Sequence, residues 1–292
     1  MRKLRVLPKN IGQRVDVFVT SRLPNFTRSA LKGLFKRGQV LVNDRPIKAG
    51  HKLRPQDTLI VDTSLLDSEP APVKLPVVYE DKDAVVINKP AGILTHSKGG
   101  LTLEPTVASF IKGKLTDKSL SGNRAGIVHR LDRGTSGVII GAKTAAVLAY
   151  LQKQFSTRQV KKAYVAVVEG QLEPAAALID APIARHPKKP QTFRVSAAGK
   201  PAQTEYHLLK SFKRGGLDFS YVELKPLTGR THQLRVHLKY VGHPVVGDPV
   251  YGRSAGPLLL HAKSLTVSLP SGETKTFSAP LPKIFKEFMD HG

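Results

Sequence analysis

The 292-residue chain contains no cysteine. This absence excludes disulfide bonds, thiol nucleophiles, and zinc or iron–sulfur sites held by cysteine. Long apolar segments are missing too, and neither a signal peptide nor a lipidation motif is recognisable. We therefore expect a cytoplasmic protein that does not act at a membrane.

Acidic residues are scarce. The chain has 22 Asp+Glu against 46 Lys+Arg, which leaves a formal net charge of +24 and a pI of about 10.3. Such an excess of positive charge favours a polyanionic partner, and nucleic acid is the commonest one. An anionic membrane surface is the alternative that the missing membrane signals disfavour.

The charge and proline patterns divide the chain into three parts. Residues 1–62 carry 14 Lys+Arg and 4 Asp+Glu, a strongly basic balance for a small domain. Residues 63–76 contain three prolines and no periodicity, which is typical of a linker. Residues 77–292 combine long predicted strands with a few helices. The sequence therefore predicts an α+β fold: a large domain around a mixed, largely antiparallel sheet with flanking helices, preceded by a small α+β domain.

Residues 126–140 hold the most distinctive local pattern. Two apolar β-branched runs flank a polar segment with glycines, which predicts a strand, a tight loop and a second strand. At the centre is Asp132, between Arg130 and Arg133, and no further acid follows before Glu169. A positive field favours the ionised form of a carboxylate, which can then attack or accept a proton. From the residues alone, a turn aspartate in a structural ion pair is the commoner explanation.

Together with this loop, the sequence contains four short motifs. The loop motif, residues 129–137, reads HRLDRGTSG. The other three are VINKPAG at residues 86–92, KKAYVAV at residues 161–167 and LTGRTHQLRVH at residues 227–237. These four motifs, in their order along the chain, resemble those of the RluA-type pseudouridine synthases, which isomerise uridine in RNA. The isomerisation gains no electrons or atoms, so we expect no metal and no other cofactor.

The resemblance implies a role for several residues of the larger domain. Asp132 would be the nucleophile, and Tyr164 would pack against a base flipped out of its stack. Arg235 would pair with Asp132, with Arg230 as the alternative for that contact. Arg130 would occupy the space that the flipped nucleotide leaves. The sequence does not decide whether attack occurs at the sugar or at the uracil ring, and each of these side chains also has an ordinary structural explanation.

The N-terminal part resembles the S-four-type RNA-binding domain, a fold of two helices and a small sheet. Thr27 is the expected N-cap of a helix over residues 28–37, in which Arg28, Lys32 and Lys36 line one face. With this resemblance, we expect that face to bind RNA. The matching pieces are residues 14–16, 27–29 and 38–43. The apolar faces of the two helices are expected at Val15, Phe18 and Val19, and at Leu31, Leu34 and Phe35.

The combined features predict a monomeric RNA pseudouridine synthase that acts on large-subunit ribosomal RNA, with transfer RNA as an alternative substrate. The rival from another class is a non-catalytic RNA-binding or ribosome-assembly factor with the same fold. A zinc site at His232 and His237 is disfavoured, because the two histidines are five positions apart rather than the four that would place them on one helical face. We expect both histidines to be surface or capping residues.

Overall fold

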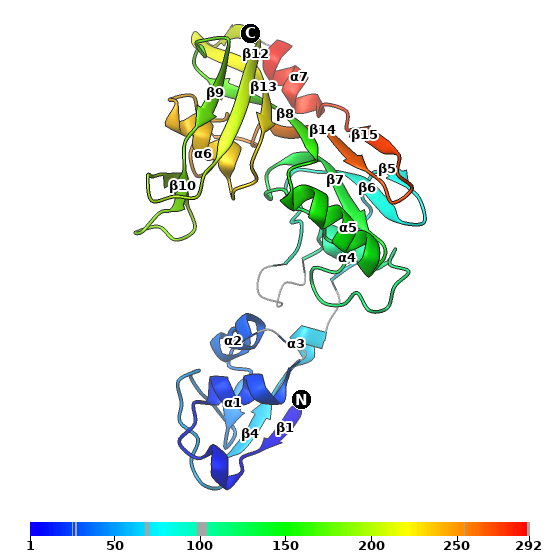
Figure 1. Ribbon diagram of the computed structural model, residues 1–292. Coiled ribbons are helices and arrows are strands. Elements are labelled where there is room, and N and C mark those ends of the chain that lie inside the picture. Colours follow the sequence, from blue (N-terminus) through cyan, green and yellow to red (C-terminus); the bar gives the residue numbers. More distant parts are fainter. Residues whose placement is uncertain (25, 27, 68–69, 98–103, 254, 291–292) are drawn as a thin grey trace. The chain divides into compact units, whose positions relative to one another are not determined.

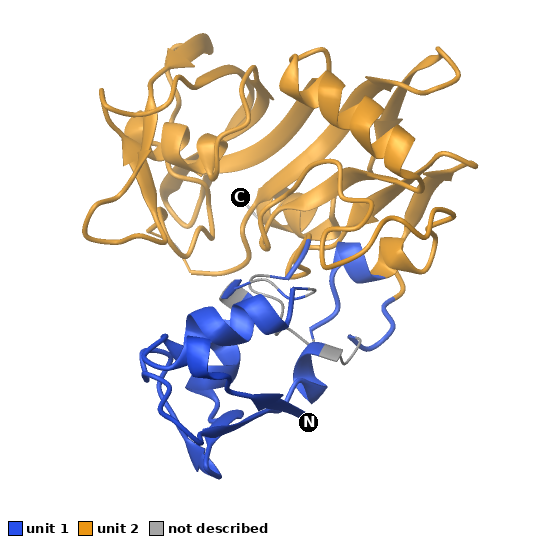
Figure 2. Ribbon diagram, turned by 60° about the horizontal axis from the view of Figure 1, so that its bottom comes forward, with its two compact units in different colours: residues 1–73, 96–109 blue, residues 74–95, 110–292 orange. Residues whose placement is uncertain are grey.

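The computed structural model describes residues 1–292 apart from 25, 27, 68–69, 98–103, 254 and 291–292 (Figure 1). The chain divides into two compact units, residues 1–73 with 96–109 and residues 74–95 with 110–292 (Figure 2). Each unit has its own sheet. The domain boundaries expected from the sequence remain a prediction.

The first unit consists of a small antiparallel sheet and two main helices. The strand order is β1-β4-β2-β3. All six apolar side chains expected on the inner faces of α1 and α2 are buried, which confirms the predicted helices. Thr27, the expected cap of α2, lies outside the described residues. The elements are β1 (Arg2–Arg5), η1 (Pro8–Asn10), α1 (Val15–Arg22), α2 (Arg28–Lys36), β2 (Val40–Val42), β3 (Arg45–Pro46), β4 (Thr58–Val61) and α3 (Ser64–Asp67).

The basic face of α2 is only partly free of intramolecular partners. Arg28 Nη2 lies 3.1 Å from Asp16 Oδ2, and Arg14 Nε lies 3.0 Å from Asp16 Oδ1. The hydrogen bond from Arg14 is the main cause that lowers the pKa of Asp16. Lys32 and Lys36 are exposed, and neither has a partner among the residues that the structure describes. These two lysines are therefore the cations of this face that a ligand can reach without breaking an ion pair.

The second unit is built on a nine-stranded sheet of order β5-β6-β7-β14-β8-β13-β12-β9, with β15 paired to β14. Of the strand pairs between described residues, β7–β14 alone is parallel, so the sheet is mixed and largely antiparallel, as predicted. The strands are β5 (Val77–Glu80), β6 (Ala84–Lys89), β7 (Ser136–Ala142), β8 (Lys161–Glu169), β9 (Ala176–Asp180), β12 (Gln203–Arg214), β13 (Leu217–Pro226), β14 (Leu260–Ser268) and β15 (Thr274–Ser278). Separately, β10 (Ile183–Arg185) and β11 (Phe193–Val195) form a two-stranded sheet.

Helices cover both faces of this sheet. The remaining helices are α4 (Val107–Lys112), whose first three residues belong to the first unit, α5 (Ala145–Ser156), α6 (Gln233–Tyr240) and α7 (Lys283–Asp290). Alternate residues of β8 face α6 and α7. Ala166 and Val168 share a buried cluster with Leu238 of α6, whereas Val165 and Val167 share one with a phenylalanine of α7. The sheet therefore holds the start of α6 against one face of β8.

One predicted strand, the apolar run before Asp132, does not form. Its only ladder contact is the isolated bridge between Ile127 and Gly141. Gly126 has a φ of 72°, and a Cβ there would lie 2.5 Å from the carbonyl oxygen of Ala142. The chain therefore makes a turn at Gly126, in a conformation that glycine favours, rather than a strand. The next residue, Ile127, then pairs with β7 through its isolated bridge with Gly141.

Candidate active site

The loop that carries Asp132 is fixed at its start by a histidine. The Nε2 of His129 accepts a hydrogen bond of 3.1 Å from the backbone N–H of Ile140, a donor that a neighbouring strand would otherwise satisfy. The imidazole also stacks on Phe155 of α5, with ring centroids 4.5 Å apart. Burial lowers the pKa of His129 to about 3, so this side chain is a neutral structural anchor.

A second segment supports the loop from behind. The ammonium of Lys89, at the end of β6, donates to the carbonyls of Pro90 at 2.8 Å, Ile93 at 2.7 Å and Arg133 at 3.2 Å. The hydroxyl of Thr95 donates to the carbonyl of Leu131 at 2.8 Å, and it accepts from the N–H of the same residue at 3.1 Å. The residues on both sides of Asp132 are therefore tied to the segment that the VINKPAG motif begins.

We expect Lys89→Met to destabilise the protein by about 1–3 kcal/mol at pH 7, because three carbonyls lose their donor. Burial lowers the pKa of Lys89 to about 7, from 10.5 for an exposed lysine. At pH values between these two pKa values, Lys89 is mostly protonated in the unfolded chain and mostly neutral in the folded protein. Wild-type stability should therefore rise with pH relative to the variant, by at most about 1.4 kcal/mol per pH unit.

Urea unfolding from pH 6 to 10 measures both effects. Lys82→Met, at an exposed position in the β5–β6 turn, is the matched control and should change neither. A difference between wild type and Lys89→Met that stays constant over this range would contradict the buried titration.

Arg235, in the first turn of α6, joins two carboxylates. Its Nε and Nη2 each lie 2.7 Å from an oxygen of Asp248, a two-point pairing, and its Nη1 lies 3.1 Å from Asp132 Oδ2. Asp248 also accepts from the N–H groups of Val250 at 2.9 Å and Tyr251 at 3.0 Å. Burial opposes both charges. The pairing nevertheless raises the pKa of Arg235 and holds the pKa of Asp248 below its usual range. Asp248 thus orients the guanidinium that faces Asp132.

His232 lies beside the same carboxylate. Its Nε2 is 3.9 Å from Asp132 Oδ2, and its backbone is left-handed, with a φ of 57°, where α6 begins. The hydroxyl of Tyr251 accepts from the N–H of Phe193 at 2.9 Å and lies 2.9 Å from His232 Nδ1. Burial lowers the pKa of His232. With the tyrosine proton directed at Nδ1, the neutral imidazole presents Nε2–H to Asp132.

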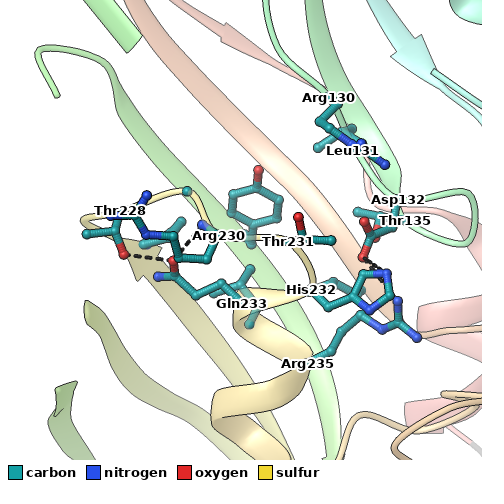
Figure 3. A pocket seen from close by; sticks show the side chains of 15 residues that line it. Arg130, Leu131, Asp132, Thr135, Thr228, Arg230, Thr231, His232, Gln233 and Arg235 are labelled. Atoms are coloured by element: carbon teal, nitrogen blue, oxygen red, sulfur yellow. Dashed lines mark hydrogen bonds and ion pairs between the residues drawn. The ribbon is translucent and has the colours of Figure 1, made fainter. Parts of the chain in front are cut away.

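A cavity of about 130 Å³ opens in front of Asp132 (Figure 3). Tyr164, which pairs with Leu224 of β13 and Ala262 of β14 at the centre of the sheet, lines it. Burial and the charge of Asp132 raise the pKa of Tyr164. This phenol therefore stays protonated at neutral pH and offers a flat apolar face with a donor at its tip.

The structure brings five of the predicted site residues together in this cavity, namely Arg130, Asp132, Tyr164, Arg230 and Arg235. Asp132 points to His232 and Arg235, while Arg230 lies away from it (Figure 3). The Arg230 side chain donates instead to the carbonyl of Pro201 at 3.0 Å. Arg235, not the alternative Arg230, therefore makes the ion pair with Asp132. Arg28, Lys32 and Lys36 belong to the other unit.

Sequence reasoning missed Asp248, Tyr251 and the position of His232. It was wrong about His237, which is fully buried between Thr204 Oγ1 and the carbonyl of Ala181, at 3.0 and 2.9 Å. The described residues hold no cluster of three or more side chains suited to a metal ion. No described helix is long and apolar enough to cross a membrane.

A family model, two curated relatives and a solved structure that resemble this chain are all named for pseudouridine or pseudouridylate synthases. A family model described as RNA pseudouridylate synthase matches residues 83–240. The uncharacterized RNA pseudouridine synthase YlyB of Bacillus subtilis is 38% identical over 96% of this chain and 94% of its own length. The ribosomal large subunit pseudouridine synthase D of Borreliella burgdorferi is 36% identical over 97% and 90%. The solved human RNA Pseudouridylate Synthase Domain Containing 1 is 30% identical, with a TM-score of 0.60 over 73% of this chain and 86% of its own.

Proposed function

The chain belongs to the RNA pseudouridylate synthase family, and we propose that it converts uridine to pseudouridine in large-subunit ribosomal RNA with Asp132 as the nucleophile. The observation that carries this proposal is the placement of Asp132. Its carboxylate faces a cavity beside Tyr164 and receives a hydrogen bond from Arg235, which a second carboxylate holds in place. A passive RNA-binding protein has no need of such an arrangement, so the non-catalytic alternative is disfavoured.

The reaction exchanges one glycosidic bond for another. The bond between the ribose and N1 of uracil breaks, a bond from the ribose to C5 forms, N1 gains a proton and C5 loses one. A carboxylate that attacks either the sugar or the ring needs to be ionised and held in contact with the base. Arg235 donates a hydrogen bond to Asp132 and fixes the orientation of its carboxylate.

The target base has to leave its stack to reach this cavity. We assign the face of Tyr164 to the contact with the flipped base, since its raised pKa suits a phenol that remains protonated. Arg130 is exposed at the cavity's edge, and we assign it to the gap that the flipped nucleotide leaves. Loops and irregular stems are the preferred targets, because unpaired bases cost least to open.

Ribosomal RNA is proposed as the substrate because the Borreliella burgdorferi relative is named for the large ribosomal subunit. Such a substrate agrees with the net charge of +24 and with a cytoplasmic enzyme. Pseudouridine mapping across ribosomal and transfer RNA, from cells with and without the protein, tests both activity and target. New sites in transfer RNA alone would replace the ribosomal assignment, and no change in either RNA, with purified protein also inactive, would refute the synthase proposal.

We propose that the first unit supplies RNA affinity through Lys32 and Lys36. The double variant Lys32→Ala/Lys36→Ala should bind RNA more weakly, and its plot of log affinity against log salt should be shallower by about 0.7–0.9 per lost phosphate contact. Turnover at saturating RNA should change little, because neither residue belongs to the unit that holds Asp132. Arg28 is left intact because it pairs with Asp16.

The control is Lys9→Ala/Lys48→Ala, which removes the same charge from two exposed lysines outside α2. Filter binding over a range of sodium chloride concentrations compares the two proteins. Equal losses in both would mean that net charge, rather than this helix face, governs binding.

A further inference from the structure

A second cavity, of about 520 Å³, lies where β13 separates from β8. The ladder between these strands ends at the pair of Leu224 and Tyr164, and the first residues of β8 pair with β14 alone. Pro226, at the end of β13, lines both this cavity and the one in front of Asp132. A strand of RNA whose target base enters the first cavity would therefore pass the second within a short distance.

The second cavity is strongly positive. Its charged lining consists of four cations and one acid, namely Arg158, Lys161, Lys162, Lys225 and Glu205. Lys225 is partly neutralised by Glu223, at 3.2 Å. In the part of the chain that the structure describes, the side chains of Arg158, Lys161 and Lys162 have no hydrogen bond or ion pair. Their donors are therefore available to a ligand.

Two of these cations are held at a cost to the fold. Arg158 follows the C-terminus of α5 with a φ of 62°, a left-handed conformation that glycine adopts with less strain. Lys162 is half-buried, and burial together with the charge of Arg158 lowers its pKa. Strain and unpaired charge at one place are typical of a binding surface rather than of a structural contact.

We propose that this cavity binds a backbone phosphate of a nucleotide next to the target uridine, with Lys162 and Arg158 as its ligands. The inference rests on the proposed RNA substrate. A phosphate fits better than a base, because lysine and arginine offer donors and no acceptors, whereas a base edge presents both. The contact would set the register of the strand and so determine which nucleotide reaches Asp132.

Lys162→Met and Arg158→Gly test this assignment, because each substitution should weaken RNA binding without lowering the stability of the fold. Each variant should bind a stem–loop RNA with an all-uridine loop about tenfold more weakly, with a salt slope shallower by about 0.7. Removing the unpaired ammonium should raise the melting temperature of Lys162→Met by about 2–4 °C. Arg158→Gly, which relieves the positive φ, should melt no lower than wild type. A structural role would instead lower both melting temperatures.

Lys118→Met is the matched control. It removes one charge from an exposed lysine beside Asp117, whose carboxylate accepts from the N–H of Ala145 at the opposite end of α5. Its affinity and salt slope should remain close to those of wild type. An equal loss of affinity in this control would overturn the assignment to the cavity.

The phosphate itself is tested by replacing loop linkages of the same RNA with neutral methylphosphonates, one at a time. Wild type should lose about tenfold in affinity at one linkage, and Lys162→Met should lose nothing further there. Additive losses at every linkage would overturn the inference. Pseudouridine formation by wild type on a large-subunit ribosomal RNA transcript is assayed in parallel, so its absence would count against the proposed function without altering the binding result.

Discussion

Asp132→Asn is expected to abolish pseudouridine formation, with a loss of about 10⁴-fold or more in kcat. The substitution keeps the size of the side chain but removes the charge that attack or proton transfer requires. RNA affinity should change little, because the basic residues supply it. The measurement is single-turnover pseudouridine formation on an RNA that contains a mapped target uridine.

The fold should tolerate this change. Arg235 keeps its two contacts with Asp248 when Asp132 is neutral, so no buried cation is left unpaired. The control is to measure thermal melting and RNA affinity on the same preparation, together with Asp132→Glu, which keeps the charge but moves it by one methylene. A folded, RNA-binding Asp132→Asn protein that retains near wild-type activity would refute the assignment of the nucleophile.

Asp248→Asn should have the largest effect on stability, a cost of about 3–5 kcal/mol. The amide cannot accept from both nitrogens of the Arg235 fork and from the N–H groups of Val250 and Tyr251, all of which now donate to this carboxylate. Arg235 would be left buried without its counter-charge. Its misplacement should also lower kcat about 100-fold, even at temperatures where the variant is folded.

Urea unfolding measures this cost, and Asp218→Asn is its control. Asp218 also faces a cation, Lys213 at 3.9 Å, but both side chains are exposed, so the expected cost is below about 1 kcal/mol. The pH dependence has a defined sign. Because the pKa of Asp248 is lowered in the folded protein, wild type should lose this stabilisation as the pH falls below about 4, and the variant should not. Equal costs for the two substitutions would contradict the role given to Asp248.

The sequence predicted the parts of this architecture that depend on local pattern. Helical spacing identified the buried faces of α1 and α2, and alternation identified the strand that carries Tyr164. The motifs also indicated that Asp132, Tyr164 and Arg235 belong to one site. The strand predicted for the apolar run before Asp132 was wrong. The chain turns at Gly126 instead, and the side chain of His129 accepts the hydrogen bond that a neighbouring strand would otherwise accept.

The features that the sequence did not predict depend on contacts between residues far apart in the chain. Asp248 is the only acid in a loop of mostly apolar residues, HPVVGDPVYG, and no periodicity relates it to Arg235, thirteen positions earlier. His232 was judged by its distance along the chain from His237, although its actual neighbours are Asp132 and Tyr251. Arg28 matched a basic helix face, but its guanidinium pairs with Asp16 of another helix. Local sequence indicates what a side chain can do, whereas its partner is set by tertiary packing.

The position of β14 has a consequence for when the enzyme becomes active during synthesis. This strand lies between β7, which follows the Asp132 loop, and β8, which carries Tyr164, yet it spans Leu260–Ser268 near the end of the chain. Chains emerge from the ribosome N-terminus first, and contacts of high sequence separation form late. Until Ser268 has been translated, the two halves of the sheet have no strand to join them. A nascent chain that has not yet reached Ser268 therefore lacks the strand that joins the Asp132 loop to Tyr164, so its site is incomplete.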